Sequence, residues 1–242
     1  MFNNQSIKVF AHDYETTGVN AAECGVLQCG LGIVTLHQDG SFEVLDKDVQ
    51  LLNPGVPIDP GASKIHGYYD IDVADKVCWM KYLGEQFETV NSLDCHAVLG
   101  FNSGTFDNRI AARAGLQPMR SIDLIRVARR LKGDKVIENA KLVTLYQHLM
   151  GKPLEKAHDA WADVHATLEL VKPSIAAAGV ANLDELMEWM RGDDGTVDMK
   201  MPWGEHKGSK LKNLKSDYVH FLLNKCSAPI SPELREGLEK CQ

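Results

Sequence analysis

The chain has 242 residues, of which 44% are hydrophobic and 24% are charged, and this composition excludes a disordered, collagenous or fibrous protein. Its most apolar stretch is interrupted by Gln28 and is shorter than the roughly 18 consecutive apolar residues of a transmembrane helix. The polar start, Met1 to Gln5, lacks the basic and apolar regions of a signal peptide. We therefore expect a soluble, cytoplasmic protein with no membrane partner.

The formal net charge of −7 is distributed unevenly along the chain. Residues 200–242 carry 8 basic and 5 acidic residues, which leaves 18 basic and 28 acidic residues in the rest. An acidic body with a basic tail suits a site where metal ions neutralise an anionic substrate, and it equally suits a solvated acidic surface. The 6 cysteines include no Cys-x-x-Cys pair, so we expect free thiols rather than a zinc site.

The first part of the chain predicts three strands in a meander. Residues 7–11 predict a short strand that leads into a turn at Gly18. Residues 26–36 form a nearly continuous apolar run, which is typical of a central strand covered on both faces. The Asp39-Gly40 pair then predicts a hairpin, with the returning strand over residues 42–52.

The rest of the chain predicts helices around one further strand at 97–101. Helices are expected at 62–66, 77–91, 107–115, 122–131, 140–150, 159–178 and 183–191. Strands followed by alternating helices predict an α/β fold with a mixed sheet. The polar segment 191–195 predicts a linker, so we expect a domain over residues 1–192 and a small basic module over 198–242.

Four carboxylates stand at expected strand ends and helix starts. Asp13 and Glu15 follow the first strand, and residues two apart in an extended segment point the same way. Asp107 opens one helix, and Asp163 lies early in another. Each of these is individually more often structural, because the chain has 33 acidic residues. Together they can bind two hard divalent cations, an arrangement that suits in-line displacement at phosphorus.

His158 lies five residues before Asp163. Five residues span about 140° around a helix, so the two side chains cannot share a helical face. We therefore place His158 in the loop before the helix, with Asp159 as the N-cap. From that loop the imidazole could approach the metal site and take a proton from water, a role for which histidine is suited near neutral pH.

The joint pattern resembles the DnaQ-like, or DEDDh, family of 3′–5′ exonucleases. The resemblance rests on three motifs: Asp13-x-Glu15-Thr16, Asn102 to Asp107, and His158-Asp159-Ala160-x-x-Asp163. Residues 53–67 also resemble the family loop that holds the terminal nucleotide. The motifs are close to those of the exonuclease I group, whereas the length and the tail from Met201 onward are most similar to the exodeoxyribonuclease X group.

The resemblance implies an RNase H-like fold and a reaction. Asp13, Glu15, Asp107 and Asp163 would hold two divalent cations, Mg²⁺ or Mn²⁺, and His158 would be the general base. The reaction would be hydrolysis of terminal DNA phosphodiesters to nucleoside 5′-monophosphates. The partner would be a DNA 3′ end. A single-stranded end is the favoured substrate, and a double-stranded end is the alternative.

The resemblance also implies contacts with the nucleic acid. The expected contact residues are Tyr14, Thr16, Gly18, Val19, His66, Asn102, Phe106 and Lys207. For His66, hydrogen bonding within its own loop is as plausible as contact with the terminal nucleotide. For Phe106, packing in the core is favoured over stacking on a base. The spacing between Asn102 and Asp107 is one residue longer than the commoner family spacing. In the tail we expect the aromatic residues mostly to pack and the lysines to contact phosphates.

Two other functions remain open. An exoribonuclease of the same fold would use the same metal chemistry, because only contacts with the 2′-OH distinguish RNA from DNA. A non-catalytic end-binding module or a proofreading subunit would keep the fold for a different purpose. The presence of all five candidate catalytic residues favours an enzyme over such a module.

Overall fold

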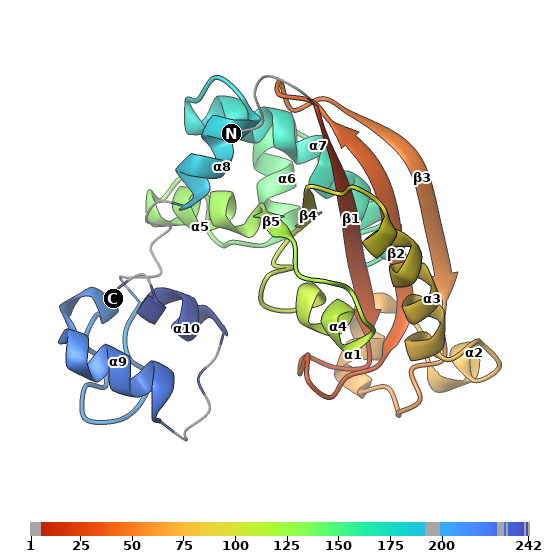
Figure 1. The fold of residues 1–242 in the computed structure, drawn as a ribbon, viewed down its shortest axis with the longest axis horizontal. Coiled ribbons are helices and arrows are strands. Elements are labelled where there is room, and N and C mark those ends of the chain that lie inside the picture. The colour runs from red at the N-terminus through yellow and green to blue at the C-terminus, as the bar shows by residue number, and fades with distance from the viewer. Residues whose placement is uncertain (1–5, 192–198, 227–229, 231, 240, 242) are drawn as a thin grey trace.

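The computed structural model of the chain describes residues 6–191, 199–226, 230, 232–239 and 241. A mixed five-stranded sheet forms the centre of the body, with strand order β3-β2-β1-β4-β5 (Figure 1). The strands are β1 (Ile7–Thr16), β2 (Val26–Leu36), β3 (Phe42–Leu51), β4 (Ala97–Gly100) and β5 (Arg120–Asp123). β1, β2 and β3 form an antiparallel meander, while β4 and β5 continue the sheet in parallel with β1. The predicted α/β fold with a mixed sheet is confirmed.

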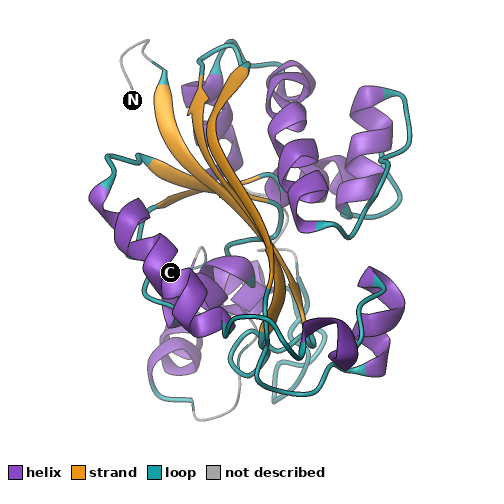
Figure 2. Cartoon of the chain, turned by 90° about the vertical axis from the view of Figure 1, so that its right-hand side faces the viewer, coloured by secondary structure: helices purple, strands orange, loops and turns teal. Residues whose placement is uncertain are grey.

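Helices cover both faces of the sheet (Figure 2). Those of the body are α1 (Pro60–His66), α2 (Asp70–Val73), α3 (Trp79–Ser92), α4 (Asp107–Arg113), α5 (Ile125–Gly133), α6 (Leu142–Met150), α7 (Ala160–Ala178) and α8 (Leu183–Arg191). Side chains of β1 alternate between two hydrophobic clusters, as the period of a strand requires. Val9 and Ala11 join the cluster formed with α5, α6, α7 and α8, and Phe10 joins the cluster formed with α3 and α4.

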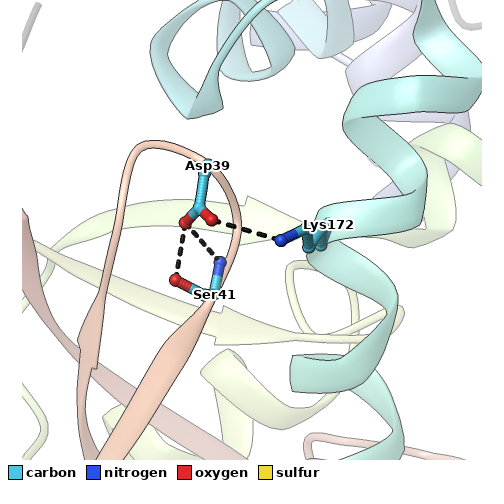
Figure 3. Close-up of polar contacts among 3 residues, drawn as sticks. All are labelled: Asp39, Ser41 and Lys172. Atoms are coloured by element: carbon cyan, nitrogen blue, oxygen red, sulfur yellow. Dashed lines mark hydrogen bonds and ion pairs between the residues drawn. The ribbon is translucent and has the colours of Figure 1, made fainter.

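Helix α7 packs closely on the turn between β2 and β3 (Figure 3). Gly40 has a φ of +81°, and a Cβ added there would lie 2.6 Å from Lys172 Cα, so both the turn and the packing require glycine. The neighbouring Asp39 accepts hydrogen bonds from Ser41 N at 2.9 Å and Ser41 Oγ at 2.6 Å. Its other carboxylate oxygen pairs with Lys172 Nζ at 3.2 Å. The predicted Asp39-Gly40 hairpin is thereby confirmed.

Two predicted elements are corrected by the structure. The first strand extends through Thr16 rather than ending at residue 11, because pairing with β2 continues through Asp13↔Gly30 and Glu15↔Gln28. Polar residues in this part of the strand obscured its continuation. The helix predicted at 122–131 begins at Ile125, after the short strand β5, whose apolar residues merge in sequence with those of the helix.

The described tail has its own hydrophobic cluster. Helices α9 (Ser216–Asn224) and α10 (Pro232–Glu239) follow the short 3-10 helix η2 (Leu211–Asn213). The buried members are Met201, Leu211, Val219, Leu222, Leu234 and Leu238. Trp203 and Tyr218 pack against them, as expected, whereas Phe221 is 45% exposed. The predicted linker falls largely on residues 192–198, outside the described residues. No helix in the described parts of the chain combines the length and apolar character needed to span a membrane.

Candidate active site

The last residues of β1 place two carboxylates on one side of the sheet. Asp13 and Glu15 continue the face that carries Val9 and Ala11, and α7 covers this face. The pairing register shifts between Glu15 and Thr16, an irregularity that bends the strand at its end. The predicted convergence of Asp13 and Glu15 on one side therefore holds, but it arises inside β1 rather than after it.

Helix α7 begins directly above β2, at a glycine. A Cβ on Gly30 would lie 2.6 Å from the carbonyl carbon and oxygen of Ala160 and 2.7 Å from Trp161 N. No larger residue fits there without displacing the helix. This close approach brings Asp163, in the first turn of α7, over the end of β1. The sequence places Gly30 in an apolar run but gives no sign of its partner, which lies 130 positions away.

A buried glutamine fixes the turn before α7. Gln28 Oε1 accepts a hydrogen bond from Ala160 N at 3.0 Å, and Gln28 Nε2 donates to Asp159 Oδ2 at 3.1 Å. The other oxygen of Asp159 caps the helix by accepting from Ala162 N at 3.0 Å, so the predicted N-cap is confirmed. In the sequence, Gln28 stands out only as an interruption of the apolar run. A lone amide in a buried strand is a signal for such a role, because buried polar groups need partners.

His158 lies in this turn before α7, as predicted, and its side chain is exposed. Its φ of 69° is in the left-handed region, where residues other than glycine are uncommon. The conformation directs the His158 N–H to Asp163 Oδ2 at 3.2 Å. Such backbone strain persists when surrounding contacts over-determine it, which the Gln28 and Asp159 hydrogen bonds do here.

Glu15, His158 and Asp163 form a group that could hold a metal ion. One ligand atom from each lies within 4.8 Å of the others. Asp163 Oδ1 is buried without a hydrogen-bond partner among the described residues, which is costly unless a cation occupies the position. Carboxylate oxygens and an imidazole nitrogen suit Mg²⁺, Mn²⁺ or Zn²⁺. The residues present therefore fit a divalent cation.

Asp13 and Asp107 complete the acidic group electrostatically. Burial is the largest cause that raises the Asp13 pKa, followed by the negative charges of Asp107, Asp163 and Glu15. Burial also raises the pKa of Asp107 to about 8, that of Glu15 to about 7 and that of Asp163 to about 6. Carboxyl groups this close together cannot all ionise cheaply without a cation. Glu15 and Asp163 thus share one ligand group with His158, and Asp13 and Asp107 lie close enough to act on it electrostatically.

The position of Asp107 depends on β1 and α4. The Tyr14 N–H donates to the Asp107 carboxylate and thereby lowers its pKa, against the larger effect of burial. One residue further along α4, Asn108 Oδ1 lies 2.8 Å from His12 Nε2, and His12 Nδ1 lies 2.9 Å from the Tyr14 hydroxyl. Burial lowers the His12 pKa to about 4, so the ring is neutral and serves as a link between β1 and α4. No pattern in the sequence pointed to this role of His12.

The last residue of β1 and the turn after it carry three of the predicted nucleic-acid contacts. Thr16 is buried, and its hydroxyl donates to the Gly18 carbonyl at 2.9 Å. Gly18 has open space around it, and Val19 is 95% exposed. The exposure of Val19 leaves its side chain free of protein contacts, and its contact with a base stays a prediction. Tyr14, in contrast, has its ring in the core and bonded to His12, so only its backbone faces the centre.

His66 lies near the centre at the end of α1. Its Nδ1 accepts from Tyr68 N at 3.1 Å, which is the local partner that sequence analysis considered. Its Nε2 is buried and makes no hydrogen bond of good geometry within the described chain. Burial is the largest cause that lowers the His66 pKa, the Thr16 backbone opposes this effect, and the nearby His158 adds to it. The ring thus adjoins His158, and contact with a terminal nucleotide stays a prediction.

The other predicted contacts are placed differently. Asn102 has a φ of 61°, and its Oδ1 accepts from Thr105 Oγ1 at 2.8 Å, so its side chain shapes the turn before α4. Phe106 is partly buried and packs against the α3 and α4 cluster, in line with the favoured core reading. Lys207 is exposed in the tail, on a turn separate from β1 and α7. Its role remains a prediction.

The fold matches solved structures of two exonucleases. A structure of exonuclease I matches with a TM-score of 0.61 and 19% identity over 77% of this chain and 44% of that chain. The zinc-bound form of E. coli exonuclease I with single-stranded DNA matches with a TM-score of 0.59 and 20% identity over 76% of this chain and 43% of that one. The chain thus spans less than half the length of these structures.

The second exonuclease is closer in size. Exonuclease X in complex with 5′ overhanging duplex DNA matches with a TM-score of 0.54 and 21% identity, over 75% of this chain and 99% of that chain. In sequence, no family model and no curated protein matches the chain. The comparisons establish that this chain has the mixed-sheet fold of exonucleases I and X.

Proposed function

We propose that this chain is a metal-dependent 3′–5′ exodeoxyribonuclease of the DnaQ-like, DEDDh type. Its substrate would be DNA 3′ ends, and its products nucleoside 5′-monophosphates. One observation carries the proposal: Glu15, His158 and Asp163 converge within 4.8 Å at the end of β1, with Asp13 and Asp107 electrostatically coupled to them. The fold shared with exonucleases solved in complex with DNA supports it.

Five side chains divide the chemistry between them. Asp13, Glu15, Asp107 and Asp163 would hold two divalent cations, Mg²⁺ or Mn²⁺. When bound, these ions would supply charge stabilisation at the attacking and leaving oxygens. His158 would accept one proton from the attacking water as the water oxygen bonds to phosphorus. The bond from phosphorus to the 3′ oxygen breaks, and that oxygen takes a proton from solvent to become the new 3′ hydroxyl. Exposure of His158 suits this role, because the imidazole must return the proton to solvent after each cycle.

The proposal includes a division of the chain into a nuclease domain over residues 1–192 and a small basic module over 198–242. The separate hydrophobic cluster of the tail supports this division. The exposed lysines of the tail, among them Lys207, would contact phosphates in a manner that weakens with salt.

The test is hydrolysis of a 5′-labelled single-stranded DNA oligonucleotide by the full chain. With Mg²⁺ or Mn²⁺ we expect a ladder that shortens from the 3′ end. The ladder should be absent with chelator and with Asp13→Ala, while Lys81→Gln, an exposed change on α3, should leave it unchanged. An intact oligonucleotide under both metals would contradict the proposal.

Parallel substrates separate the alternatives. Degradation of an RNA of the same sequence, with the DNA left intact, would identify an exoribonuclease. Binding of DNA ends without hydrolysis of the DNA or the RNA would identify an accessory module. Co-purification with a polymerase would identify a proofreading subunit. A duplex with a 5′ overhang measures the preference between single- and double-stranded ends.

A further inference from the structure

A basic pocket lies between the body and the last helix, outside the acidic centre. Its volume is about 240 Å³, and it is bordered by the turn before α4 and by α4, β5, α5 and α10. In Figure 1, α10 is on the side of the tail that faces α5 of the body. The polar groups that face it are Thr105, Arg109, Ser121, Arg126, Arg129 and Arg235.

The concentration of arginine there is unusual for this chain. The sequence contains 8 arginines within a net charge of −7, and four of them line this one pocket. Two carboxylates, Asp123 and Glu239, also border it. Asp123 Oδ1 accepts from Asn102 N at 2.7 Å and Oδ2 from Gly104 N at 3.0 Å, and the charge of Arg129 opposes the rise in the Asp123 pKa that burial causes. Four guanidinium groups against two carboxylates leave the pocket with an excess of positive charge.

Helix α10 contributes to the pocket through one of its faces. Leu234 and Leu238, four residues apart, are buried in the tail cluster. Arg235 comes directly after Leu234, and Glu239 comes directly after Leu238. Both line the pocket. Packing of the tail core thus presents Arg235 to the body, so the pocket is completed only when the tail is folded.

The pocket is adjacent to the acidic centre along the chain. Thr105 and Arg109 each lie two residues from Asp107. Consecutive Cα atoms are about 3.8 Å apart, so each of these Cα atoms is within about 7.6 Å of that of Asp107. A strand whose 3′ end lies at the acidic centre can therefore reach the pocket within a few nucleotides.

We propose that this pocket binds a backbone phosphate of the DNA strand that is being degraded, away from the scissile bond. The proposal rests on the proposed nuclease function. Arginine pairs with phosphate oxygens through two parallel N–H groups, and the Thr105 and Ser121 hydroxyls add donors of the right kind. The same phosphate chemistry could come from a free nucleotide, and the experiment distinguishes the two sources.

The experiment compares two substrates in the full chain with Mg²⁺. One is a twelve-residue oligothymidylate, and the other is the p-nitrophenyl ester of thymidine 5′-monophosphate, which has no second phosphate. Arg109→Gln and Arg235→Gln should each raise KM for the oligonucleotide about 3- to 10-fold, with kcat retained. The dependence of log(kcat/KM) on log[salt] should become shallower by about 0.7. Hydrolysis of the ester should not change.

Matched variants test the interpretation. Lys81→Gln removes the same charge from α3 and should change neither substrate. The double variant Arg109→Gln/Arg235→Gln should lose less than the sum of the single effects, because both arginines would hold one phosphate. An unchanged KM and salt dependence in both single variants would overturn the proposal. Equal losses on the ester and the oligonucleotide would also overturn it, by showing that the arginines support the acidic centre.

Two further measurements separate the remaining outcomes. If inhibition by thymidine 5′-monophosphate weakens in the variants while the oligonucleotide parameters stay constant, the pocket holds a free nucleotide and the DNA proposal is wrong. If wild type hydrolyses neither substrate, the nuclease function fails. Fluorescence anisotropy of the labelled oligonucleotide in chelator then still tests the pocket through the same variants and the same salt dependence.

Discussion

Helix α7 meets the sheet at two places with opposite electrostatic character. At its first turn the backbone passes Gly30, and Asp163 joins Glu15 and Asp13 in a group of like charges. Three turns later the backbone passes Gly40, and Lys172 pairs with the opposite charge of Asp39. A glycine permits close packing at both contacts.

The difference distinguishes a structural contact from the acidic centre. At the Gly40 contact each charged group has a local partner, so the packing and the electrostatics agree. At the Gly30 contact the same packing forces carboxylates together and raises their pKa values. Such a conflict is typical of a site that binds a cation. Substitutions that disturb the Gly30 contact or the Gly40 contact should therefore have different effects.

The largest effect is expected from Asp13→Asn, which removes the carboxylate that is coupled to the other three. Loss of cation binding at this position should lower the hydrolysis rate about 1,000-fold or more, because cations contribute several kcal/mol to such reactions. Initial rates on the labelled oligonucleotide check this. A loss below tenfold would show that Asp13 does not hold a catalytic cation.

His158→Gln should act on the rate alone. Removal of a general base typically lowers kcat about 100- to 10,000-fold. Because the side chain is exposed, the melting temperature should stay within about 1 °C of wild type. His165→Gln, an exposed histidine on α7, is the matched control and should keep full activity. Equal rates for the two variants would remove His158 from the mechanism.

Paired glycine substitutions compare the two contacts directly. Gly30→Ala and Gly40→Ala each place a Cβ about 2.6 Å from backbone atoms of α7 and should cost about 1–3 kcal/mol of stability. Only Gly30→Ala shifts the turn that carries His158, so it should also lower kcat about 10- to 100-fold. Urea unfolding and initial rates of the folded protein measure both effects. Similar kcat values in the two variants would mean that the position of α7 over Gly30 does not control the site.

The sequence predicted much of this arrangement but not the long-range contacts that hold α7 against the sheet. The meander, α7 and the four carboxylates follow from hydrophobic period, turn signals and motif spacing, which are local. The partners of Gln28 and Gly30 lie about 130 residues away, and no local pattern reports such a contact. The true end of β1 was also missed, because the carboxylates of Asp13 and Glu15 interrupt the apolar pattern of the strand. Four-residue β5 was hidden beside an amphipathic helix.

The pH dependence of stability should sharpen the electrostatic contrast. The folded pKa values of about 6 for Asp163, 7 for Glu15 and 8 for Asp107 lie above those of the unfolded chain. The metal-free fold therefore binds more protons than the unfolded chain, and stability should fall as pH rises through about 6 to 8. Mg²⁺ should raise the melting temperature more at pH 8 than at pH 5, and Asp13→Asn should flatten the pH dependence. Equal Mg²⁺ effects at both pH values would contradict this.

The smallest effect is expected at the other contact, from Lys172→Met. Lys172 and Asp39 have side chains that are 64% and 58% exposed, so water and salt screen their attraction. The melting temperature should change by about 1 °C or less. The two hydrogen bonds from Ser41 are the main cause that lowers the Asp39 pKa to about 2, ahead of Lys172. Titration by NMR should therefore show a low Asp39 pKa in Lys172→Met and a larger rise in Ser41→Ala. The reverse order would mean that α7 stabilises the hairpin through charge rather than through the close packing at Gly40.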